Sequence, residues 1–111
     1  MDNLLRLAIQ AASVYDGRDI RIGAVAVRKD GVIVSSRNSH VLGPMHSAHA
    51  ERRLMRKAGY GAIVYVARIR FDGSISMAKP CPACEALLRN KRVKNVFYTN
   101  WDGEIEELNL H

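Results

Sequence analysis

The fold is decided by residues 49–71, which read HAERRLMRKAGYGAIVYVARIRF. The first part predicts a helix that ends near Gly59, because glycine readily takes the left-handed conformation in which many helices end. Residues 62–71 follow, and their apolar residues, Val64, Val66 and Ile69 among them, are typical of a strand. A helix that leads into an apolar strand indicates an α/β protein.

Upstream, residues 3–15 carry apolar side chains at spacings of three and four, which predicts an amphipathic helix that stops near Gly17. Residues 22–27 and 32–36 are rich in β-branched side chains. Lys29, Asp30 and Gly31 lie in the gap between these runs, and an Asp-Gly pair in this position predicts a hairpin.

Downstream, Pro82 suits the first turn of a helix that continues through Leu88, since proline loses no useful hydrogen bond there. Residues 93–99 predict a fourth strand, and residues 104–110 could return as a fifth after a short turn. The whole predicts a mixed five-stranded sheet covered by helices. A length of 111 residues fits one domain, 1–111.

Composition limits the setting and the partners. The chain has 17 basic and 11 acidic residues, a net charge of +6, which favours phosphate-bearing partners, either a nucleotide or a polynucleotide. Lys91, Arg92 and Lys94 form the clearest basic cluster, although most such clusters are solvated faces. No apolar run is long enough to span a bilayer, and we see no secretory pattern, so we expect a cytoplasmic protein without a membrane partner.

Cys81 and Cys84 are the only cysteines, and in an intracellular protein a pair at this spacing is more often a metal clamp or a redox pair than a disulfide. At a helix N-terminus their thiol pKa is lowered, which favours the thiolates that bind zinc. His49 begins another predicted helix and could add a third ligand. Glu51, two residues later, could then approach a water in the open fourth position.

The motifs His49-Ala50-Glu51 and Pro80-Cys81-Pro82-Ala83-Cys84 resemble the HxE and PCxxC signatures of the cytidine deaminase superfamily. The resemblance implies a three-layer α-β-α fold and one catalytic zinc ion per subunit, held by His49, Cys81 and Cys84. It also implies that activated water replaces the amino group of a cytosine and releases ammonia. Glu51 would act first as base and then as acid.

The same resemblance implies substrate contacts. Asn38 would touch base and ribose, and the backbone near Ala50 and Pro80 would meet the base edge. Arg52 matches an arginine that lies beside the metal-binding cysteines in small nucleoside deaminases, although a solvated helix arginine explains it equally well.

The substrate class stays open. The short turn before the last strand is similar to the antiparallel ending of small nucleoside deaminases. This resemblance implies an enzyme of pyrimidine salvage that acts on free (deoxy)cytidine or its nucleotide. It also implies a homo-oligomer, either a dimer or a tetramer. However, His40 stands where those enzymes carry a glutamate for the sugar, and Lys79 before the cysteine motif favours a nucleotide or strand. Single-stranded DNA or RNA therefore remains an alternative substrate, and a purine base is also open.

Two other interpretations remain. His46 with His49, Cys81 and Cys84 would make a closed structural zinc site, in which case the chain would not be an enzyme. The cysteine pair alone could be a thioredoxin-like redox motif, but such folds place it after an early strand and have no use for the upstream HxE motif.

Overall fold

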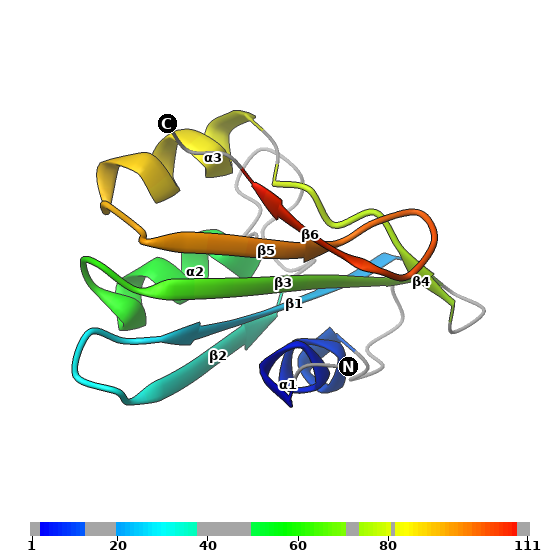
Figure 1. Cartoon of the computed structure of the whole chain (residues 1–111), viewed down its shortest axis with the longest axis horizontal. Coiled ribbons are helices and arrows are strands. Elements are labelled where there is room, and N and C mark those ends of the chain that lie inside the picture. The colour runs from blue at the N-terminus through cyan, green and yellow to red at the C-terminus, as the bar shows by residue number, and fades with distance from the viewer. Residues whose placement is uncertain (1–2, 13–19, 38–49, 71–73, 81, 109–111) are drawn as a thin grey trace.

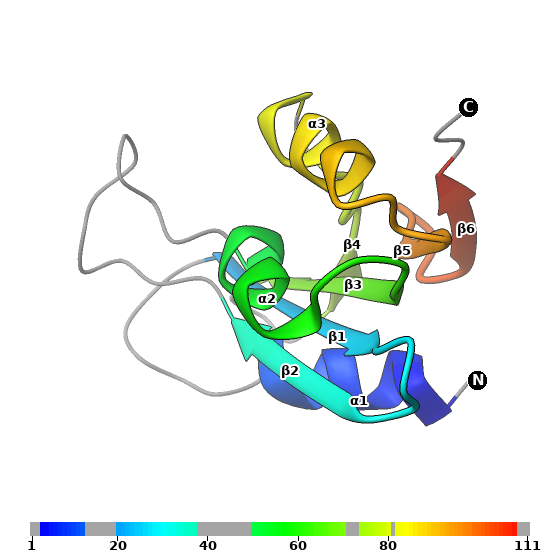
Figure 2. The ribbon, with the colours of Figure 1, turned by 90° about the vertical axis from the view of Figure 1, so that its left-hand side faces the viewer.

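The computed structural model describes residues 3–12, 20–37, 50–70, 74–80 and 82–108. Its elements form three layers, with one helix on one face of a mixed sheet and two helices on the other, as Figures 1 and 2 show. The predicted three-layer α/β architecture is therefore confirmed.

Within the described residues the sheet has six strands, one more than predicted. They are β1 Ile20–Val27, β2 Ile33–Arg37, β3 Ile63–Arg70, β4 Ile75–Ser76, β5 Asn95–Thr99 and β6 Ile105–Leu108. The main path runs β2-β1-β3-β5-β6, and β4 pairs with β3 beside it. The additional strand, β4, has only two residues, too few for a period-2 pattern to appear in the sequence.

Pairing directions in the sheet decide where the helices begin. β3 and β5 are parallel, whereas β6 returns antiparallel to β5, as the short turn before it predicts. A short connection joins the helix α2, Ala50–Ala58, to β3, and another joins the helix α3, Pro82–Asn90, to β5. Each helix therefore runs back along the sheet, and both begin toward the carboxyl ends of the two parallel strands (Figure 1).

The helix α1, Asn3–Ala12, covers the opposite face. Its buried Leu5 and Ala8 pack on Val25 and Tyr65, and the Tyr65 ring stacks on Phe97 at a centroid distance of 5.1 Å. Burial of the predicted apolar stripe explains why this segment is helical.

The larger core lies between the sheet and the pair α2 and α3. Leu54 and Leu88, both fully buried, come from the two helices and pack with Val64, Val66 and Val96 of the strands. This core holds the two helices against the sheet and against each other. Within the described residues there is no helix with the length and apolarity needed to cross a membrane.

Candidate active site

The N-termini of α2 and α3 define the candidate site. Because parallel strands end at the same edge of a sheet, the carboxyl ends of β3 and β5 lie together there. The helices that carry the two sequence motifs both begin toward this edge. Ligands in α/β sheets bind outside the carboxyl ends of the strands, so this edge is the expected place for a site.

The segment that leads into α3 is fastened to the end of β5. The backbone N–H of Ala78 donates to the carbonyl of Thr99 at 2.8 Å. Pro80, a predicted substrate contact, is buried, whereas Lys79 is exposed. The segment before α3 therefore places the first turn of the helix against the sheet.

Cys84 is the one predicted metal ligand within the described residues. It is the third residue of α3, and its side chain is 1% exposed. The other predicted ligands, His49 and Cys81, lie outside the described residues. This also explains why no cluster of three possible metal ligands occurs in the described part of the chain.

Three further predicted residues open α2. Ala50, Glu51 and Arg52 are its first three residues, as the sequence predicts for the HxE helix, and nothing is described of their side chains. The remaining predicted residues, Asn38, His40 and His46, lie outside the described residues.

The donor chemistry of the predicted set fits zinc. One imidazole nitrogen and two thiolate sulfurs are ligands that Zn²⁺ prefers, and three protein ligands are typical of catalytic zinc sites. Cys84 fits this role by position, because it lies shielded from solvent in the first turn of the helix that carries the PCxxC motif.

The structure adds a buried polar group that sequence reasoning missed. Thr99, at the end of β5, is fully buried and donates its hydroxyl to the carbonyl of Ser76 at 2.7 Å. Arg68 pairs with Ser76 across β3 and β4, and its Nη1 lies 3.5 Å from the carbonyl of Met77. Among the described residues, Arg68 Nε and Ser76 Oγ are buried without a hydrogen-bond partner. Donors of this kind are candidates to contact a polar group bound at this edge.

A signal for Arg68 was present in the sequence. Side chains alternate between the two faces of a strand, so Arg68 shares a face with Val64 and Val66, which belong to the core under α2 and α3. A cation in the inward register of an apolar strand is unusual and indicates a special environment.

Tyr98 lies beside this group on β5. Burial raises the pKa of its phenol above the ordinary value of 10.0, and the carboxylate of Glu106 on β6 raises it further. Glu106 is the direct cross-strand partner of Tyr98, which explains the electrostatic effect. The phenol is therefore neutral at physiological pH.

Comparison with known proteins identifies the class. The family model of the cytidine and deoxycytidylate deaminase zinc-binding region matches residues 1–100. This match covers both motifs and nearly the whole chain. The chain therefore belongs to the cytidine and deoxycytidylate deaminase family.

Solved structures share the fold. The cytidine deaminase from Burkholderia pseudomallei is similar with a TM-score of 0.75 and 23% identity, over 99% of this chain and 94% of that one. Those from Mycobacterium leprae and Mycobacterium tuberculosis each have a TM-score of 0.63, with 19% and 24% identity. These two cover 96% of this chain and 91% and 87% of their own. No curated protein sequence matches the chain.

Family membership defines the general activity. The chain is a hydrolase of the type that acts on the C–N bond of a cyclic amidine, and its family carries out zinc-dependent deamination of cytosine. A closed structural zinc module and a redox pair do not account for a family match of this extent.

Proposed function

We propose that this enzyme deaminates the cytosine of a free (deoxy)cytidine nucleoside or nucleotide to the uracil form and releases ammonia. His49, Cys81 and Cys84 would hold one zinc ion per subunit. The observation that carries the proposal is the common position of the HxE and PCxxC helices, which both begin toward the carboxyl edge of β3 and β5.

Zinc with three protein ligands supplies an activated water near neutral pH. Glu51 would take one proton from the attacking water and pass it to the ring nitrogen, and would then take the remaining hydroxyl proton and pass it to the departing amine, so that the uracil carbonyl forms as ammonia leaves. The same carboxylate thus acts first as a base and then as an acid. Glu51 lies two residues after His49, a position from which it would stay near the metal without binding it.

The end of the sheet supports a small substrate. Residues 100–104 make a tight turn in which Asn100 Oδ1 accepts from the backbone N–H groups of Asp102 and Glu104, both at 2.9 Å. This turn returns β6 antiparallel to β5, the ending that the resemblance associates with small nucleoside deaminases. The similar structures are also named cytidine deaminases.

Substrate contacts follow the family pattern in this proposal. Asn38 would meet the base and the ribose, and the backbone near Ala50 and Pro80 would meet the base edge. Lys79 is exposed beside the buried Pro80 and is available to a substrate phosphate. His40 replaces the usual sugar-binding glutamate, so sugar recognition would differ, and Arg52 would moderate the charge of the thiolates.

The substrate is tested with the purified, zinc-loaded full chain. Cytidine, deoxycytidine, deoxycytidylate and a cytosine-bearing oligonucleotide are incubated separately, and uracil formation and ammonia release are followed. We expect turnover of the nucleosides or of deoxycytidylate. Turnover of the oligonucleotide alone would favour the polynucleotide alternative, and activity on none of the four would contradict the cytosine assignment.

His46 separates an open metal site from a closed one. Replacing His46 by alanine should leave the zinc content of the protein unchanged, because the proposed catalytic site uses only three protein ligands. Loss of zinc from His46→Ala, measured by metal analysis after dialysis, would support the closed structural site instead.

A further inference from the structure

A basic cleft lies at the end of the sheet opposite the candidate active site. Its volume is about 1200 Å³, and its walls come from the turn after β1, the α2–β3 connection and the α3–β5 connection. Figure 1 shows these three connections together at the left-hand end of the molecule. β3 leads from the cleft to the candidate site, and a strand of its length spans roughly 20–25 Å. The cleft is therefore separate from the proposed catalytic centre.

The cleft is cationic. Its described lining includes five basic residues and no carboxylate; the basic residues are Arg28, Lys29, Arg89, Arg92 and Lys94. Such a concentration of one charge in a concave surface attracts anionic ligands over a distance.

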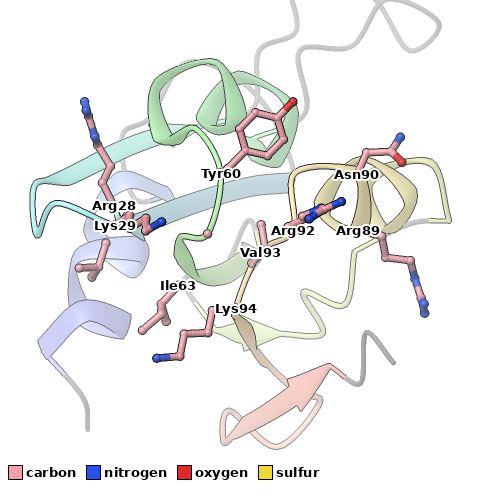
Figure 3. A pocket seen from close by; sticks show the side chains of 11 residues that line it. Arg28, Lys29, Tyr60, Ile63, Arg89, Asn90, Arg92, Val93 and Lys94 are labelled. Atoms are coloured by element: carbon pink, nitrogen blue, oxygen red, sulfur yellow. The ribbon is translucent and has the colours of Figure 1, made fainter.

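Two of these cations are engaged by neighbouring carboxylates outside the lining. Arg28 pairs with Asp30 at 3.0 Å, and Arg89 pairs with Glu85 at 2.8 Å. Figure 3 shows that both arginine side chains point away from the centre of the cleft.

The other three cations lie around the centre. Figure 3 shows Lys29 from the turn after β1 and Arg92 and Lys94 from the α3–β5 connection, on two sides of the cleft. Within the described part of the chain, no carboxylate pairs with any of the three. Their positive charge is therefore available to a ligand.

An aromatic ring accompanies these cations. Tyr60 also lines the cleft, and it is 63% exposed, although an aromatic side chain normally gains by burial. Lys91 Nζ lies 5.0 Å from the centre of its ring, so another cation stands beside it. A smaller hollow of about 410 Å³ shares Arg28, Lys29 and Tyr60 with the cleft, and its lining also includes Asp30, the carboxylate that pairs with Arg28. The cations of the cleft are thus spread along its walls rather than converging on one point.

We propose that this cleft is a second, non-catalytic binding site for single-stranded nucleic acid. Lys29, Arg92 and Lys94 contact successive phosphates, and Tyr60 stacks on a base. A basic groove combined with an exposed aromatic side chain is the arrangement that binds single strands without regard to sequence.

Other occupants fit the cleft less well. A second copy of the chain related by a two-fold axis would place the same cations opposite one another, which is repulsive. One phosphate group would leave most of the cations unused, because they are divided between the turn after β1 and the stretch from the end of α3 to β5. A strand uses several of them at once.

The binding test uses the full chain and a fluorescein-labelled oligothymidylate of about 15 nucleotides, a length within the range of known single-strand sites. Fluorescence anisotropy is measured from about 0.05 to 0.5 M salt. Oligothymidylate contains no cytosine, so deamination does not enter the measurement. We expect binding that weakens steeply as salt is raised.

Charge variants locate the site. The double variant Lys29→Gln, Lys94→Gln should lower the salt slope by about 1.4, since each phosphate contact to a single strand contributes about 0.7. Affinity at 0.1 M salt should fall on the order of tenfold or more. The control Arg6→Gln, Arg70→Gln removes the same charge from exposed residues on α1 and at the far end of β3, and its binding should stay close to that of the wild type.

Tyr60 variants test base stacking. Tyr60→Ala should weaken binding roughly fivefold or more without changing the salt slope, because stacking releases no counterions. Tyr60→Phe keeps the ring and should bind as the wild type does. The residue is exposed, so neither variant should disturb folding.

Several results would overturn the proposal. If the cleft variant and the control variant lose the same affinity for oligothymidylate, overall charge alone drives binding. Equally tight binding of thymidine triphosphate or of polyglutamate would assign the cleft to a small nucleotide or an acidic polypeptide. Strand binding should survive Glu51→Gln, so failure of this proposal and failure of the proposed deamination are separate outcomes.

Discussion

Glu51 is the residue on which the proposed chemistry depends. Replacing Glu51 by glutamine removes the proton carrier while keeping a side chain of the same size two residues from His49. We expect zinc content to stay at the wild-type value and kcat to fall by about two to four orders of magnitude, the usual contribution of a positioned acid or base. Turnover that survives this change would show that another group moves the protons.

Thr99 shows how the polar group at the edge of the sheet is stabilised. Thr99→Val has nearly the same shape but lacks the hydroxyl that binds the carbonyl of Ser76 at 2.7 Å. The buried carbonyl then loses a donor, so the free energy of unfolding should fall by about 1–3 kcal/mol. Denaturant unfolding measures this change. Ser35→Ala, on an exposed strand position, is the control and should change stability by less than about 0.5 kcal/mol.

Tyr98 predicts a decline of stability at high pH. Burial first, and Glu106 second, raise the pKa of its phenol in the folded protein above 10.0. Above pH 10.0 the unfolded chain releases this proton more readily than the folded protein does. The free energy of unfolding should therefore be unaffected by this group at lower pH and should fall as pH rises past 10.0.

Denaturant unfolding between about pH 8 and pH 11 checks this expectation. Tyr98→Phe should flatten the decline, whereas Tyr60→Phe, on an exposed ring, should not. An equal decline in wild type and Tyr98→Phe would assign it to other groups.

At the scale of elements, the end of α2 depends on a left-handed residue. Gly59 follows the helix with φ of +70°, and a Cβ added there would meet no atom within 4 Å. Gly59→Ala should therefore lower the free energy of unfolding by about 1–2 kcal/mol through backbone conformation alone. Gly59→Asn should lower it less, since asparagine tolerates this conformation. Thermal unfolding measures both variants. If Gly59→Ala and Gly59→Asn lower Tm equally, the left-handed conformation at this position does not limit stability.

The helices α2 and α3 also show why the two motifs meet. The two motifs lie about 30 residues apart in the chain, from His49 to Cys81. Their apolar faces pack with Val64 and Val96 in one core. Because β3 and β5 are parallel, packing of both helices on these strands turns both N-termini toward one edge.

At the scale of the whole molecule, we expect the chain to assemble with copies of itself. Leu7, Ile33 and Ile105 are exposed, with 39%, 52% and 43% of their surface open in one chain. Assembly could bury such apolar side chains, and the resemblance to small deaminases implies a dimer or tetramer. Light scattering should give a mass of about two or four times 12.4 kDa. A 12.4 kDa species at every concentration would contradict this expectation.

Charge is also organised at this scale. The net charge of +6 is visible in the sequence, but it does not reveal a cleft. The structure gathers Lys29 with Arg92 and Lys94 at one end of the sheet, away from the edge that carries Cys84. The molecule thus has two separate ends, one for the proposed chemistry and one for the proposed strand.

The sequence by itself determined the three-layer α/β fold, the order of its main elements and the pair of motifs that marks the family. Periodicity, glycine and proline act locally. Gly59 therefore predicts the end of one helix and Pro82 the start of another from the sequence alone. Motif residues such as His49 and Cys81 are recognisable because metal chemistry restricts their type and spacing.

Only the tertiary structure decided what depends on contacts between distant residues. The short strand β4, the buried group of Arg68 with Thr99, and the basic cleft bring together segments that no local pattern connects. The alternation along β3 already places Arg68 in the inward register, but its neighbours Thr99 and Ser76 are known only from the fold. The physical reason is that burial and charge compensation are properties of the packed molecule, set by which surfaces meet after the chain has folded.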